Sequence, residues 1–338
     1  MSFNYYIPTK ILFGAGKLNE LSKEALPGRK ALIVISAGKS IKENGYLDRL
    51  VNILRSKEVE YTVFDKILPN PVKRHVAEGA QLARQEGCDF VIGFGGGSSI
   101  DSAKSIAVMA TNPGDYWDYV GGGSGKGLPL QNKPLPVVAI TTTAGTGTEA
   151  DPWTVITKED TNEKIGYGNE YTFPVLSVVD PELMLTVPAD LTAYQGFDAL
   201  FHSTEGYIAN IATPVSDAFA LKSIELIAKY LPIAVKDGKN LEARSNVALA
   251  NTLSGLVEST SSCTSEHSME HALSAYHPKL PHGAGLIMLS EAYYSFFAAK
   301  VPERFAEMAK AMGVNVDALP AEERPKTFVK ALVSLQEA

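Results

Sequence analysis

Cysteine is scarce in this chain, and a secretion signal is absent from its first residues. Only two cysteines, Cys88 and Cys263, occur in 338 residues, and they lie far apart in the sequence. A framework of disulfides is therefore not expected, and such low cysteine usage is typical of a reducing compartment. The segment Met1-Ser2-Phe3-Asn4-Tyr5 has neither the basic stretch nor the apolar core of a signal peptide. We therefore expect a cytoplasmic protein.

Long apolar runs and clusters of basic residues are also missing. No run of about 18 apolar residues occurs, so the sequence predicts no membrane-spanning helix and no membrane partner. The net charge is -7, which argues against nucleic acid as the main partner. Apolar residues make up 45% of the chain and charged residues 20%, as in ordinary globular proteins. Because 338 residues are too many for one simple core, we expect two domains.

The order of the apolar segments predicts an α/β first domain and an all-α second domain. Residues 31–35, 89–94 and 137–140 are typical of buried strands, and residues 75–85 have the apolar spacing of a helix. This alternation predicts βαβ units and a mostly parallel sheet. From Thr192 onward the apolar residues recur at helical spacing. Prolines interrupt regular structure between the two patterns, so we predict domains at 1–183 and 184–338.

Two segments after predicted strands suit the binding of phosphate groups. Gly95-Gly96-Gly97-Ser98-Ser99-Ile100-Asp101 joins a strand to a helix, where backbone N–H groups and the helix N-terminus favour an anion. The third glycine of the common G-x-G-x-x-G fingerprint is missing, and a tight turn without a ligand is the alternative interpretation. A second segment, residues 141–149, is rich in threonine and would lie at the same sheet edge. Together they predict that phosphate groups bind at this edge of the sheet.

Histidine is rare, but its positions are informative. Five of the six histidines lie in the second predicted domain. Asp198 and His202 are four residues apart, as are His267 and His271, and each pair would share one face of a helix. A Pro-His-Gly segment follows at His282. A single histidine is more often a polar residue of a packed helix than a ligand, but this set predicts a metal site.

The residue types limit the metal without selecting it. Imidazole together with carboxylate suits Fe(II), Zn(II) or Mn(II). Cys263 lies four residues before His267 and would face the same way. Because a thiolate favours a closed structural zinc site over an open catalytic one, we interpret Cys263 as a free thiol outside the site.

These segments together resemble the iron-containing (group III) alcohol dehydrogenase family over essentially the whole chain. The most specific part is the pairing of Asp198 and His202 with His267, His271 and the Pro-His-Gly segment. The other matching segments are Ile11-Leu12-Phe13-Gly14-Ala15-Gly16, Pro69-Asn70-Pro71, the Gly-Gly-Gly-Ser-Ser-Ile-Asp and Thr-Thr-Ala-Gly-Thr-Gly segments, and Asp180-Pro181-Glu182-Leu183.

The resemblance implies a role for each of these residues. The implied metal ligands, with Fe(2+) as the metal and Zn(2+) or Mn(2+) as alternatives, are Asp198, His202, His267 and His282. His271 would stand beside the metal and move the proton of the alcohol. The implied cofactor contacts are Gly96, Gly97, Ser98 and Asp101, with Thr142, Thr143 and Thr146 near the pyrophosphate and Lys164 near a ribose hydroxyl. A homodimer is also implied by the family.

Two features depart from the family pattern. The segment between His271 and His282 differs in length and composition from the commonest version, which makes His277 a rival to His282 as the fourth ligand. The chain also stops at Ala338 within a predicted helix, whereas family members usually continue through further C-terminal helices. We therefore expect C-terminal helices to be missing from the second domain.

The expected activity is hydride transfer between NAD(P)(H) and a small primary alcohol or aldehyde. A glycerol dehydrogenase or a dehydroquinate-synthase-like enzyme of the same superfold is one alternative. The second would need basic residues near the metal, and residues 194–207 and 258–277 contain no lysine or arginine. An alternative of another class is a metallohydrolase, in which the ion activates water and the glycine-rich segment binds a substrate phosphate.

The segment after the first buried strand favours NADP(H) over NAD(H). Sites that select NAD commonly place a carboxylate there, which binds the ribose 2′-hydroxyl and would repel a 2′-phosphate. Here the segment is Ser36-Ala37-Gly38-Lys39-Ser40, and the first acid is Glu43. Ser36 could donate to a phosphate and Lys39 offers a compensating charge. A solvated Lys39 with no ligand is the alternative interpretation.

Overall fold

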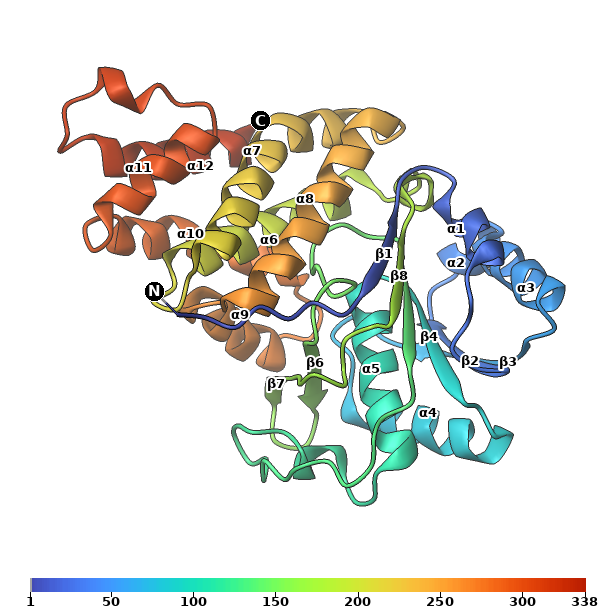
Figure 1. The fold of residues 1–338 in the computed structure, drawn as a ribbon. Helices are drawn as coiled ribbons and strands as arrows, with labels where there is room; N and C mark the ends of the chain where they lie inside the picture. Colours follow the sequence, from blue (N-terminus) through green and yellow to red (C-terminus); the bar gives the residue numbers. More distant parts are fainter. Residues whose placement is uncertain (1) are drawn as a thin grey trace. The chain divides into compact units, whose positions relative to one another are not determined.

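The computed structural model describes residues 2–338, which form two compact units (Figure 1). The first unit comprises Ile7–Thr143 and Thr148–Leu183. The second comprises Met184–Ala338, the N-terminal residues up to Tyr6 and the short segment Ala144–Gly147. The first unit is α/β and the second is all-α, which confirms the predicted fold class.

The first unit is built on a six-stranded sheet in which every neighbouring pair is parallel. Its strands stand in the order β1-β8-β5-β4-β2-β3, and β6 and β7 form a separate antiparallel pair. The bounds are β1 (Lys10–Phe13), β2 (Lys30–Ser36), β3 (Glu60–Ile67), β4 (Phe90–Gly95), β5 (Val137–Thr141), β6 (Thr154–Lys158), β7 (Glu163–Tyr167) and β8 (Leu176–Val179). Parallel strands require crossover connections, and helices supply most of them.

Helices cover both faces of this sheet (Figure 1). They are α1 (Lys17–Glu20), α2 (Ser40–Glu43), α3 (Tyr46–Ser56), α4 (Lys73–Glu86) and α5 (Gly97–Thr111). Side chains of β2 alternate between two cores: Leu32 joins the core under α4 and α5, and Ile33 joins the core under α3. Because both faces are buried, the central strands β2, β4 and β5 contain continuous apolar runs, and this is why the sequence identified them.

The second unit is a bundle of helices. Its members are α6 (Ala189–Ile208), α7 (Pro214–Lys236), α8 (Leu241–Thr260), α9 (Ser265–Tyr276), α10 (His282–Ala298), α11 (Pro302–Ala311) and α12 (Arg324–Glu337). Helix α6 packs against α7, α8 and α10. Glycines permit the close approach: a Cβ on Gly196 would lie 2.2 Å from Leu231, and one on Gly206 would lie 2.3 Å from Val257. Helix α6 is therefore held tightly in the bundle.

The strands expected at 31–35, 89–94 and 137–140 and the helix expected at 75–85 are confirmed as β2, β4, β5 and α4. The strands β1, β3, β6, β7 and β8 were not identified from the sequence. Among residues 2–338, no helix combines the length and the apolar character needed to cross a bilayer.

Candidate metal centre

Helix α6 places the first two candidate ligands one turn apart. Asp198 and His202 are both buried, and Asp198 Oδ1 lies 3.4 Å from His202 Nδ1. The same nitrogen lies 3.3 Å from the carbonyl oxygen of Gly145. A Cβ on Gly145 would lie 3.0 Å from Asp198 Oδ2, so glycine lets this backbone approach the carboxylate without crowding it. The four-residue spacing produces the shared face that the sequence predicts.

Helices α9 and α10 bring two more imidazoles to the same carboxylate. His267, in the first turn of α9, has its Nε2 3.4 Å from Asp198 Oδ1. His282 is the first residue of α10, and its Nε2 lies 3.6 Å from that oxygen. Three imidazoles from three helices therefore converge on one carboxylate oxygen. Of the two rivals for the last position, His282 reaches Asp198, whereas His277 is exposed at the C-terminal end of α9.

The spacing of these atoms fits a small divalent cation. Two ligand atoms that each lie about 2.1 Å from a tetrahedral ion are about 3.4 Å apart. The distances from Asp198 Oδ1 to the three ring nitrogens are 3.4, 3.4 and 3.6 Å. The donor set, one carboxylate and three imidazoles, is also one that Fe(II), Zn(II) and Mn(II) accept. The residues therefore fit a metal ion.

Two buried glutamates stand behind the imidazoles. His267 Nδ1 forms a hydrogen bond with Glu205 Oε2, and His282 Nδ1 forms one with Glu270 Oε2. Both glutamates are fully buried. A carboxylate that accepts from one ring nitrogen fixes the ring and leaves the other nitrogen free to bind a metal. In both histidines that other nitrogen is the one that faces Asp198.

The sequence analysis missed Glu205 and Glu270, although their positions carry a signal. Glu205 lies seven residues after Asp198 and three after His202, which puts all three on one face of α6. Glu270 lies three residues after His267 on α9. A search for acids at helical spacing from the candidate ligands would have found both.

Burial and the neighbouring imidazoles shift the pKa values of the buried groups in this centre. Burial would raise the pKa of the Asp198 carboxyl, but His202, His282 and His267 hold this pKa well below its usual range. Burial likewise opposes ionisation of Glu205, yet the charge and hydrogen bond of His267 keep its pKa below the ordinary value. Burial, together with the neighbouring charge of His267, lowers the pKa of His202 to about 3. His202 is therefore neutral near pH 7, the form in which imidazole binds a metal.

His271 stands beside the centre. It is half-buried, and its ring centroid lies 5.5 Å from that of His282 and 6.3 Å from that of His267. Its ring is within reach of Glu270 and His282. His271 therefore lies next to the rings of His267 and His282.

The glycine-rich segment in the first unit has the geometry of a close backbone approach. Gly95 has a φ of 152°, a conformation that favours glycine, and Gly96 caps the N-terminus of α5. A Cβ on Gly96 would lie 3.0 Å from Thr143 Cγ2, and Thr142 N donates to Gly95 O over 2.9 Å. The glycine-rich and threonine-rich segments are therefore neighbours at the carboxyl ends of β4 and β5, as expected.

The remaining residues that the sequence predicts to contact the cofactor differ in burial and in hydrogen bonding. The Asp101 carboxylate is buried, accepting from Thr148 Oγ1 over 2.7 Å and from Val155 N over 2.9 Å, and burial raises its pKa to about 6. Lys164 donates to Asn70 Oδ1 over 3.0 Å. Gly97 is buried, whereas Ser98 is partly exposed. Thr146 belongs to the second unit.

Ser36 and Lys39 occupy the end of β2 and the turn that follows it. Ser36 is half-buried as the last residue of the strand. The Lys39 side chain is 82% exposed, and its Nζ lies 3.9 Å from Glu43 Oε1. So exposed a pair is weak, which leaves the lysine free to turn toward another anion.

Comparison with known proteins agrees with the fold. Residues 8–181 match the family model for iron-containing alcohol dehydrogenase, and residues 192–338 match the C-terminal model of the Fe-containing alcohol dehydrogenase family. The chain is 36% identical to 1,3-propanediol dehydrogenase of Citrobacter freundii, over 98% of this chain and 85% of that protein. It is 36% identical to the NAD-dependent methanol dehydrogenase of Bacillus methanolicus, over 97% and 85%.

A solved structure of an alcohol dehydrogenase has the same fold as this chain. The crystal structure of an alcohol dehydrogenase from an archaeal, halo-thermophilic Red Sea brine pool source, bound to NZQ, superposes with a TM-score of 0.93 at 35% identity. The match covers 100% of this chain and 86% of that one. The chain belongs to the iron-containing alcohol dehydrogenase family, and it is an oxidoreductase of the alcohol dehydrogenase class.

Proposed function

We propose that this protein is a metal-dependent alcohol dehydrogenase that transfers hydride between NAD(P)(H) and a small primary alcohol or aldehyde. The observation that carries the proposal is the convergence of three imidazoles on Asp198 Oδ1 at distances of 3.4 to 3.6 Å. A bound divalent cation would supply Lewis acidity toward the alcohol oxygen, and a bound nicotinamide would supply the redox chemistry. We assign residues 184–338 as the metal-binding domain and residues 1–183 as the dinucleotide-binding domain.

The residues of the centre then divide by role. Asp198, His202, His267 and His282 hold the cation, with Fe(2+) proposed as the metal. Glu205 and Glu270 orient His267 and His282 through their Nδ1 atoms. Each of these glutamates accepts a hydrogen bond from its histidine and thereby keeps the opposite ring nitrogen turned toward Asp198.

His271 is the proposed proton carrier. Imidazole changes protonation state near neutral pH, so it can accept the proton that an alcohol loses and pass it to solvent. His271 is partly exposed, whereas His202 and His267 are buried, so it has access to water that they lack. It lies beside His282 at a ring distance of 5.5 Å.

The dinucleotide is proposed to bind at the carboxyl ends of β4 and β5. Backbone N–H groups at Gly96, Gly97 and Ser98 and the N-terminus of α5 would attract its pyrophosphate. Thr142 and Thr143 lie beside this segment, since Thr142 N donates to Gly95 O. Contacts with Asp101, Thr146 and Lys164 remain part of the proposal.

We further propose that the protein prefers NADP(H) to NAD(H). The end of β2 carries Ser36, no acid precedes Glu43, and Lys39 is exposed and only weakly paired. Two relatives are named for NAD or NADH, so this chain would differ from them. The ratio of kcat/KM for NADPH to that for NADH tests it, and Ser36→Asp should move preference toward NADH. A wild-type preference for NAD(H), or equal values, contradicts this assignment.

The proposed function is tested by metal analysis and turnover on one preparation. Protein loaded anaerobically with Fe(2+) should reduce short aldehydes with NAD(P)H, and Asp198→Ala, His202→Ala and His267→Ala should each lose both metal and turnover. The loss of one ligand should reduce metal binding by several kcal/mol, about 10²-fold or more. A metallohydrolase would bind metal without any effect on nicotinamide fluorescence. Full metal occupancy in the three variants removes the ligand assignment.

A homodimer is proposed as the assembly.

A further inference from the structure

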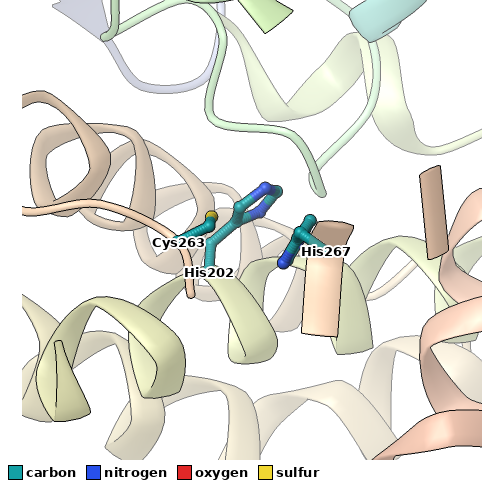
Figure 2. Close-up of side chains that lie close together, drawn as sticks. All are labelled: His202, Cys263 and His267. Carbon is teal, nitrogen blue, oxygen red and sulfur yellow. The ribbon is translucent and has the colours of Figure 1, made fainter. Parts of the chain in front are cut away.

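The histidines of the centre are approached by sulfur as well as by oxygen. A second group of atoms that could bind a metal overlaps the Asp198 set. It consists of Cys263 Sγ, one ring nitrogen of His202 and one of His267, all within 4.8 Å of one another. Figure 2 shows these side chains gathered together, with the sulfur of Cys263 directed toward the His202 ring. The rings of His202 and His267 are stacked with centroids 4.1 Å apart. All three residues belong to the second unit.

A carboxylate completes this group. Glu258, on α8, has Oε2 3.9 Å from Cys263 Sγ and Oε1 3.4 Å from His202 Nε2. His202 therefore turns Nδ1 toward Asp198 and Nε2 toward Glu258. One imidazole thus faces two donor sets, on opposite sides of its ring. The first is the carboxylate position, formed by Asp198, His202, His267 and His282. The second is the thiol position, formed by Cys263, His202, His267 and Glu258.

We propose that the thiol position binds a thiophilic divalent cation of the Zn(2+) class. Thiolate, imidazole and carboxylate together form a common zinc donor set, whereas Mn(2+) favours oxygen and nitrogen. On binding, the Cys263 sulfur forms a bond to the ion and the thiol proton is released to solvent; no oxidant is needed. The inference rests on the proposed function only in sharing two histidines with the proposed catalytic site.

Sharing those histidines has a consequence for activity. His267 belongs to both positions, and it cannot direct the same nitrogen to two ions at once. Two divalent ions this close would also repel each other strongly in a buried site. We therefore expect a single ion in the centre, so that Zn(2+) at the thiol position displaces the ion at the carboxylate position and lowers turnover.

Cobalt spectroscopy tests the thiol position directly. Co(2+) added anaerobically to the full chain should give a sulfur-to-cobalt charge-transfer band in the near ultraviolet. Cys263→Ser should lose this band while it keeps the visible bands of nitrogen- and oxygen-bound Co(2+). Cys88→Ser is the matched control because Cys88 is the other cysteine and lies buried in the first unit, away from Cys263, which is partly buried in the second. The control should keep the band, and a band that persists in Cys263→Ser overturns the proposal.

Zinc affinity gives the second measurement. Removing a thiolate ligand should weaken Zn(2+) binding by more than about 100-fold, since even groups outside the ligand set change metal affinity about 10- to 100-fold. Inhibition of the Fe(2+)- or Mn(2+)-loaded enzyme by Zn(2+) should weaken in parallel. Equal Zn(2+) affinity in the wild type and Cys263→Ser contradicts the proposal. If the variant does not fold, X-ray absorption of wild-type protein with Zn(2+) decides, with one sulfur at about 2.3 Å expected.

The same probes separate this inference from the proposed function. Asp198→Ala removes a donor of the carboxylate position only, so it should lose turnover and keep the sulfur-to-cobalt band. If the wild type shows the band but no nicotinamide-dependent turnover with any metal, the proposed function fails and the thiol position stands. If turnover is normal and no sulfur is found near Zn(2+) or Co(2+), the thiol position fails and the proposed function stands.

Discussion

Replacing Glu270 should weaken metal binding without removing a ligand. Glu270 is fully buried, and its Oε2 is hydrogen-bonded to His282 Nδ1. Glu270→Gln keeps the size and an acceptor oxygen but removes the charge. Keeping the size matters because a Cβ on Gly285 would lie only 2.9 Å from Glu270 Cγ, so the side chain fills its space. Glu270→Leu removes the acceptor and frees the ring of His282 to turn.

The expected loss of metal affinity follows from the strength of the hydrogen bond between Glu270 and His282. A hydrogen bond to a charged group contributes about 1.5 to 3 kcal/mol, and the carboxylate behind a metal-binding histidine changes affinity by about 10- to 100-fold. These ranges agree, since each tenfold change in Kd is about 1.4 kcal/mol. We expect about a tenfold rise in Kd for Glu270→Gln and about a 100-fold rise for Glu270→Leu. Competition with a chelator of known affinity measures both.

Glu266→Gln is the matched control. Glu266 lies on the same helix and is equally buried, but His267 and His282 form their glutamate hydrogen bonds with Glu205 and Glu270. The control should therefore bind metal with a Kd close to that of the wild type, well short of the roughly 10- to 100-fold change expected for a carboxylate behind a metal-binding histidine. The reasoning is refuted if Glu270→Gln and Glu270→Leu keep the wild-type Kd, or if Glu266→Gln weakens binding equally.

Three further predictions concern the centre and its support. His282→Ala should lose bound metal while His277→Ala keeps it, as measured by mass spectrometry of dialysed protein; the reverse result transfers the ligand role to His277. His271→Ala should keep its metal but turn over about 10²- to 10⁴-fold more slowly, and an unchanged rate and pH profile would leave His271 without a role in proton transfer. Gly255→Ala would place a Cβ 2.1 Å from the carbonyl oxygen of Gly147, so it should lower the free energy of unfolding by about 1–3 kcal/mol in denaturant titrations. An unchanged free energy of unfolding would contradict this prediction and would show that the Ala144–Gly147 segment can move to make room for the added methyl group.

The strands that the sequence predicted share one physical property. β2, β4 and β5 are buried on both faces, so their inner positions are all apolar or glycine and the run is visible without knowledge of its neighbours. The edge strands β1 and β3 expose part of their surface and mix polar with apolar residues. Burial of these edge strands depends on partners far away in the chain, and a local pattern does not contain that information.

The sequence by itself determined the local part of the metal centre. The four-residue spacing of Asp198 and His202 gives a shared face on any α-helix, because the helix repeats every 3.6 residues. It also determined the order of strands and helices that defines an α/β unit followed by a helical one. These features are short-range, so the backbone geometry of one segment is enough to fix them.

Only the tertiary structure decided which side chains complete the centre. The packing of α6, α9 and α10 brings His282, and not His277, to Asp198, and it places Glu205 and Glu270 against the Nδ1 atoms of His267 and His282. The packing also brings Cys263 beside His202. Cys263 lies 61 positions after His202 in the sequence, and no spacing pattern predicts their contact. The physical reason is that contacts between helices depend on crossing angles and on side-chain volumes, such as the glycines that let α6 approach its neighbours.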